Sequence, residues 1–175
     1  MKIIFCFFIF LSFPIFSEGA NNPLPEGFRE IKLGMGINDV KEKLKADPLF
    51  NYRGDPDVSM LSSPNNTLIE CSGFSYIKNA YFQFHEEKLY IIILVLNSMK
   101  IDHYSVYTKL MEKYGNPDSL SPEEILWSSD IVRMSLERPL SMKYIKKDVF
   151  EKLKTEGRAE KSMRILSRER FLELF

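Results

Sequence analysis

The side chains that could carry out catalysis are few, and their spacing does not favour it. His85, Glu86 and Glu87 could together bind a metal or move a proton, but neighbouring positions on a tight turn point apart. The sequence instead predicts a solvated hairpin tip at these three residues. The run at residues 128–130 (Ser-Ser-Asp) lacks the glycine elbow and the placed histidine of a hydrolase triad. His103 follows a predicted helix start and is expected at the surface.

Cysteine chemistry is restricted to one side chain. The chain has two cysteines, and Cys6 lies in the N-terminal leader, so only Cys71 remains for the folded domain. A single thiol cannot form an internal disulfide, and its apolar surroundings predict a buried small side chain. Glycine-rich phosphate loops, zinc-type Cys/His spacing and calcium-loop ligands do not occur in the sequence. We therefore predict no catalytic residue, no metal site and no cofactor, and expect that the protein is not an enzyme.

The N-terminus has the pattern of a secretory signal peptide. Lys2 precedes a largely apolar run at residues 3–16, and small residues follow it. The run is shorter than the roughly 20 apolar residues that span a bilayer, although an uncleaved anchor is the alternative. Small-residue rules allow cleavage after Ser17 or after Gly19, and we take residues 1–19 as the signal. The protein is then expected in the periplasm or secreted, with no stable membrane anchor after cleavage.

Length and composition indicate one ordinary globular domain. Roughly 155 residues remain after cleavage, enough for a hydrophobic core. Hydrophobic residues make up 45% of the chain and charged residues 27%. Lys plus Arg equals Asp plus Glu, at 24 each, so no net field favours nucleic acid as a partner.

Hydrophobic spacing predicts the first half of the domain. Ile37, Val40 and Leu44 fall at helical intervals, and Pro48 closes the helix. The turn-rich segment at residues 51–66 is expected to be a long loop. Three strands should follow, and their predicted ranges are 68–72, 80–84 and 89–96.

The strand at residues 89–96 is so apolar that it should be central, because such an edge would invite aggregation. Its alternate side chains should face opposite sides of the sheet. One of the two sets is expected to contact the helices, and the sets are Ile91, Ile93 and Val95 against Ile92, Leu94 and Leu96.

The second half repeats this order. Asp102 should cap a helix that ends at Gly115. Three short strands are then expected, over residues 126–128, 131–136 and 142–145. The predicted fold class is α+β, with a tandem helix–three-strand repeat that forms a mainly antiparallel sheet at residues 20–147 with both helices on one face.

A charged helical tail is predicted at residues 148–175. We expect a helix over residues 148–156, a break at Gly157 and helix again to the end. Apolar residues in the second part are spread around the helical wheel, so it is poorly amphipathic. Its very apolar end is expected to dock, either on its own domain or on a partner.

Three segments resemble a known family pattern. Residues 32–44 read KLGMGINDVKEKL, residues 110–117 read LMEKYGNP, and a strand–turn–strand lies at residues 84–89. These are similar to motifs of small exported bacterial proteins, namely the outer-membrane assembly lipoproteins of the SmpA/OmlA (BamE-like) type and the beta-lactamase-inhibitor-protein-like fold. No lipobox cysteine is present. The resemblance implies an α/β periplasmic domain that binds other proteins.

These features predict a periplasmic, non-enzymatic protein-interaction domain that serves a cell-envelope assembly, with another envelope protein as its partner. The alternative is a ligand-binding or enzyme-inhibiting module that uses the sheet face and the loop at residues 51–66. Aromatic and large apolar side chains dominate binding energy at protein interfaces. The candidate interaction residues are Trp127, Tyr81, Phe171, Leu172 and Phe175.

Overall fold

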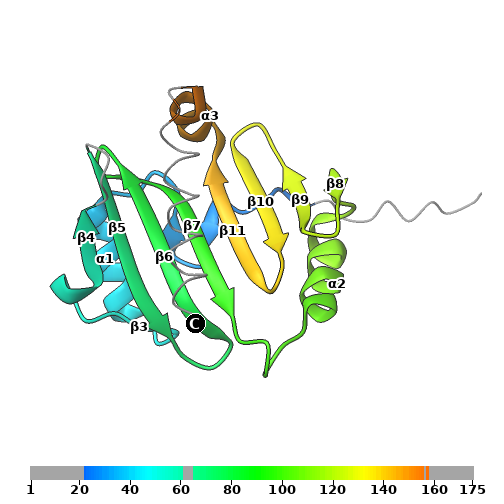
Figure 1. Cartoon of the computed structure of the whole chain (residues 1–175), viewed down its shortest axis with the longest axis horizontal. Coiled ribbons are helices and arrows are strands. Elements are labelled where there is room, and N and C mark those ends of the chain that lie inside the picture. The colour runs from blue at the N-terminus through cyan, green and yellow to red at the C-terminus, as the bar shows by residue number, and fades with distance from the viewer. Residues whose placement is uncertain (1–21, 61–64, 156, 158–175) are drawn as a thin grey trace, which may run out of the picture.

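A computed structural model describes residues 22–60, 65–155 and 157 of the chain. The fold is mixed α+β, with a mostly antiparallel sheet and three helices, one of them C-terminal (Figure 1). The predicted signal peptide and residues 158–175 of the predicted tail lie outside the described residues. No helix within the described part combines the length and the hydropathy needed to cross a membrane.

The main sheet has nine strands in the order β3-β5-β6-β7-β11-β10-β9-β8, with β4 also paired to β5. A separate hairpin joins β1 (Gly27–Phe28) to β2 (Ile31–Lys32). The strands of the main sheet are β3 (Phe50–Asn51), β4 (Val58–Met60), β5 (Asn66–Gly73), β6 (Ile77–His85), β7 (Lys88–Leu96), β8 (Ser119–Leu120), β9 (Glu124–Ser128), β10 (Val132–Glu137) and β11 (Ser141–Lys146).

The helices begin and end close to the predicted signals. Helix α1 (Ile37–Ala46) buries Val40 and Leu44. Helix α2 (His103–Tyr114) is capped by Asp102, whose carboxylate accepts hydrogen bonds from the Ser105 amide at 2.8 Å and hydroxyl at 2.6 Å. Gly115 follows α2 with φ of 78°, a conformation that glycine adopts without strain. Helix α3 (Lys147–Thr155) follows β11 directly.

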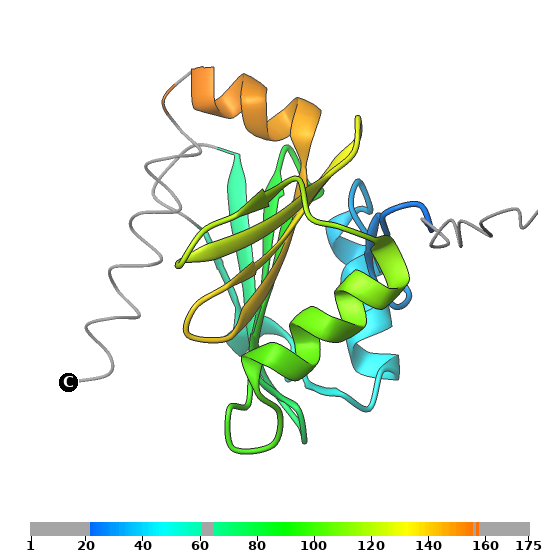
Figure 2. The ribbon, with the colours of Figure 1, turned by 90° about the vertical axis from the view of Figure 1, so that its right-hand side faces the viewer.

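Strand β7 divides its side chains between the two faces of the sheet, and from Ile91 to Leu96 they alternate as predicted. Ile92 and Leu94 are buried in the main core, and Leu96 packs at its edge. This core also contains Val40 and Leu44 of α1, and the apolar side of α2 packs against it. Figure 2 shows α1 and α2 on the same side of the sheet. The prediction that one of the two sets contacts the helices is confirmed.

The opposite sheet face, here called the second face, carries two smaller apolar clusters. Leu153 of α3 packs with Tyr90 and Ile91 of β7. The other cluster holds Leu68 and Tyr81. Apart from α3, no described element lies over this face in either view (Figures 1 and 2).

The loop predicted at residues 51–66 contains more regular structure than expected. Its first residue belongs to β3, a short 3-10 helix (Asp55–Asp57) and β4 follow, and β5 begins at its last residue. The cause is a buried carboxylate. Asp57 accepts hydrogen bonds from the Arg53 amide at 2.7 Å and from the Arg53 guanidinium at 2.6 Å and 2.9 Å. These bonds fold the segment back so that β4 can pair with β5.

Candidate functional site

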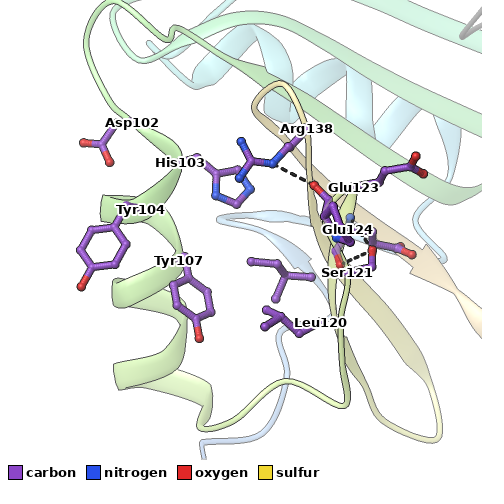
Figure 3. A pocket seen from close by; sticks show the side chains of 11 residues that line it. Asp102, His103, Tyr104, Tyr107, Leu120, Ser121, Glu123, Glu124 and Arg138 are labelled. Atoms are coloured by element: carbon purple, nitrogen blue, oxygen red, sulfur yellow. Dashed lines mark hydrogen bonds between the residues drawn. The ribbon is translucent and has the colours of Figure 1, made fainter.

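An open cleft of about 670 Å³ lies between α2 and the β8–β9 hairpin (Figure 3). One wall is the first half of α2, and the other wall is β8 with the turn that follows it. The Asp102 cap fixes the start of the helix wall. On the other side, the Ser121 amide donates to the Glu124 carbonyl at 2.9 Å. The Glu124 amide donates in return to the Ser121 hydroxyl at 3.0 Å. Each wall is therefore held by hydrogen bonds within its own segment.

Large apolar side chains face the cleft or stand at its rim. Tyr107 points from α2 toward Leu120 of β8, and Tyr104 stands at the outer rim (Figure 3). Tyr107 rests against Trp127, with ring centroids 6.5 Å apart. Tyr104 is 73% exposed and Leu120 is 66% exposed. An apolar pair this exposed, beside a hollow, is typical of a contact surface and not of a core.

Strand β8 is the last strand on its side of the sheet. It pairs with β9 through Ser119 and Leu120, and no described strand pairs with its other edge. A free edge presents unpaired backbone donors and acceptors to any extended segment that approaches it. The cleft thus combines an open strand edge with apolar side chains.

The polar end of the cleft contains His103 and Arg138, which lie beside each other (Figure 3). Arg138 donates from Nε to the Pro122 carbonyl at 2.9 Å, and it forms no ion pair with any described residue. Burial lowers the pKa of His103, and the charge of Arg138 lowers it further, while Asp102 opposes the shift. This end of the cleft therefore favours a negatively charged group.

The acidic side chains around the cleft do not neutralise Arg138. Hydrogen bonds from Ser105 hold the pKa of Asp102 below its usual range. Glu124 is paired with Arg133, whose Nη2 lies 2.9 Å and 3.0 Å from its two carboxylate oxygens. Glu123 points away from α2 (Figure 3).

The predicted interaction residues lie elsewhere. Trp127 is 2% exposed on the helix-covered side, where its indole nitrogen donates to the Gly115 carbonyl at 3.0 Å. Tyr81 is 3% exposed on the second face. Both rings are buried, and their role in an interaction stays a prediction. Phe171, Leu172 and Phe175 lie outside the described residues, so their role stays a prediction.

The side chains considered for catalysis do not come together. His103 lines the cleft, Cys71 borders a separate polar hollow, and His85 lies in a third hollow. Asp130 is exposed in the turn between β9 and β10. Within residues 22–60 and 65–155, no three His, Cys, Asp or Glu side chains are grouped as a metal site would require.

His85 is not solvated, contrary to the prediction for the hairpin tip. It is 8% exposed, and its Nδ1 lies 3.0 Å from Oδ1 of Asn66, the residue opposite it on β5. Only Glu86 and Glu87 form the turn, both with positive φ, so His85 is still a strand residue that faces inward. Cys71 is buried as predicted, and burial, followed by the charges of Asp57 and Glu70, raises its pKa to about 12.

Sequence reasoning missed the residues that form the cleft. Tyr104 lies three residues before Tyr107 and so extends the apolar spacing of α2 by one turn, beyond the part that the sheet covers. This additional apolar position in α2 is the sequence feature that could have indicated the cleft. No hydrophobic period marks the two-residue strand that carries Leu120, and Arg138 lies beside α2 only because β10 pairs with β9.

No curated protein and no solved structure shows significant similarity to this chain. The model of one protein family, the TP0088 domain, matches residues 26–156. The matched span contains the three helices and all strands of both sheets, and thus the architecture that forms the cleft. The chain belongs to the TP0088 domain family.

Proposed function

We propose that this protein is an exported, non-enzymatic interaction domain that serves a cell-envelope assembly. It binds an extended segment of another envelope protein in the cleft between α2 and β8. The observation that carries the proposal is the exposed apolar pair, Tyr104 and Leu120, on opposite walls of an open cleft.

The chemistry of the cleft points to an extended, partly acidic peptide. The free edge of β8 offers main-chain hydrogen bonds, which is how sheets accept an added strand. Tyr104, Tyr107 and Leu120 would contact apolar side chains of that peptide. Arg138, which has no carboxylate partner in the described structure, would pair with an acidic side chain.

The proposed exported location rests on the apolar leader at residues 1–19.

The proposed architecture is a tandem repeat. Each half consists of one helix and three strands. The first half holds α1 with β5, β6 and β7, and the second holds α2 with β9, β10 and β11. In this proposal the two halves join at the β7–β11 pair. The cleft belongs to the second half, where β8 extends the sheet beyond the repeat.

Photo-crosslinking in cells of the source organism tests the proposal. A benzoylphenylalanine at position 104 or 120 should give the same adduct, which mass spectrometry identifies. The matched control is position 76, where Tyr76 is 53% exposed in the turn between β5 and β6. The adduct should disappear when Arg138→Glu is added. An adduct from position 76 alone would place the interface elsewhere and reject this function for the cleft.

A second candidate is a ligand-binding or enzyme-inhibiting module that uses the sheet face and residues 51–66. A polar hollow of about 510 Å³ supports it, lined among others by Arg53, Glu70 and Asn79. A small ligand that binds only the folded state raises the melting temperature. This candidate predicts a ligand whose thermal shift is lost in Asn79→Ala and kept in Tyr104→Ala.

A further inference from the structure

A smaller hollow of about 250 Å³ lies where three elements meet, at the end of β6 and β7 that is opposite the β5–β6 turn. The β6–β7 hairpin contributes Lys88, the end of β11 contributes Lys146, and α3 contributes Lys152. Gly34 closes one side, and its φ of 90° lies in the region that favours glycine. We call this the lysine hollow.

The positive charges of the lysine hollow are largely uncompensated. Lys88 and Lys152 form no ion pair with any described residue, and the Lys146 amine lies 3.7 Å from the Asp148 carboxylate, beyond hydrogen-bonding distance. Among the described residues, Glu86 is the only acidic one that lines the hollow, and its side chain is largely exposed. Three lysines that line one small space give it a positive potential, which would attract an anion.

A buried histidine makes the lysine hollow more than a set of surface lysines. Nδ1 of His85 donates to Oδ1 of Asn66, which is itself buried. The ring of Tyr90 packs edge-on against the imidazole, with centroids 6.3 Å apart. These contacts fix the imidazole orientation. Nε2 has no hydrogen-bond partner in the described structure, and the nearest carboxylate oxygen, from Glu86, is 3.7 Å away.

We propose that the lysine hollow binds a small oxyanion, a phosphate or carboxylate group, between Lys88, Lys146 and Lys152. Because Nδ1 of His85 donates to Asn66, the free Nε2 would accept a hydrogen bond from a hydroxyl of hydrogen phosphate. The volume of the hollow is below the roughly 300–1,000 Å³ of pockets that bury drug-sized ligands. The occupant is therefore a small anion or the charged end of a longer molecule. The site is separate from the cleft beside α2, so it does not rest on the function proposed above.

Titration with inorganic phosphate at constant ionic strength, followed by amide chemical shifts, tests this proposal. Saturable shifts are expected at Gly34, Leu89 and Val149, which line the hollow. Lys88→Gln and Lys152→Gln should each weaken binding by about fivefold or more, since a charge-assisted hydrogen bond is lost. Lys154→Gln is the matched control, because Lys154 is exposed on the same helix and does not line the hollow.

A parallel titration with acetate identifies the anion. Saturation by phosphate alone assigns a phosphate site, saturation by acetate alone assigns a carboxylate site, and saturation by both assigns a general oxyanion site. The proposal is overturned if neither anion gives saturable shifts at Gly34 and Leu89. It is also overturned if Lys154→Gln weakens binding as much as Lys152→Gln does, because that result would show unspecific attraction to the helix.

Discussion

Cys71 should be chemically silent in the folded protein. Its thiol is buried, and a pKa near 12 leaves almost no thiolate at pH 8, whereas an unfolded cysteine is partly ionised there. We expect its reaction with a disulfide reagent at pH 8 to be slower by on the order of 10³-fold in the native state than in guanidinium chloride. Mass spectrometry of the Cys71 peptide measures this rate apart from Cys6. Similar rates in the two states would mean that the thiol is accessible.

His103 should titrate below the ordinary histidine pKa of about 6.5, because burial and the neighbouring Arg138 disfavour its charged form. The unfolded chain then binds this proton more readily than the folded chain does. His103 therefore lowers the free energy of unfolding as the pH falls below about 6.5. NMR titration of the imidazole should show the low midpoint, and Arg138→Gln should raise it. An unchanged midpoint in that variant would mean that the charge of Arg138 does not affect the pKa of His103.

An acidic peptide in the cleft should act on His103 in the opposite direction. A carboxylate beside Arg138 would offset the charge that disfavours the imidazolium, so binding should raise the pKa of His103. The same NMR titration, repeated with the crosslinked partner segment as a synthetic peptide, measures the change. A peptide that binds elsewhere would leave the midpoint where it was.

At the scale of the elements, β7 is the strand that ties the core together. Leu94 is fully buried in a core that includes residues of β6, β11 and α1, so Leu94→Ala should cost about 2–5 kcal/mol of unfolding free energy. Met99 lies just beyond β7 and is 90% exposed, so Met99→Ala should change stability by less than about 0.5 kcal/mol. Urea unfolding of both variants gives the comparison. A loss below about 0.5 kcal/mol for Leu94→Ala would contradict a central position for the strand.

The helices and the six main strands could be predicted from the sequence because their signals are local. Helical spacing marked α1 and α2, Asp102 and Gly115 marked the ends of α2, and the apolar run marked β7 as central. The strand bounds differ by only a few residues at either end.

The site could not be predicted in the same way because its residues meet through distant pairing. Strand β8 is only two residues long and has no period to detect, yet it forms one wall of the cleft. The burial of His85 depends on Asn66, which lies 19 positions earlier and faces it across β5 and β6. At Tyr90 a register shift in the β6–β7 pair adds an extra residue, so Tyr90 and Ile91 share one face against strict alternation.

For the molecule as a whole, we expect a chain ending at Gly157 to fold. The main core lies between Leu24 and Tyr144, and the cluster beneath α3 is completed by Leu153. Circular dichroism and thermal unfolding should show native secondary structure and one cooperative transition. Loss of cooperativity would mean that the domain extends past residue 157. A chain that ends before Leu153 is the useful contrast, because it opens the cluster beneath α3.

The position of β11 has a consequence for how the chain is made. β11 does not join the sheet at an edge, since it inserts between β7 and β10. In a chain that ends between Leu96 and Ser141, β7 can pair with β6, and the segment at residues 34–36 binds its first residues, but its other edge from Ile91 to Val95 has no native partner. An apolar strand with an open edge is a template for pairing with other chains. Purified chains that end within this interval should therefore aggregate most readily, and chains that end after Lys146 should not.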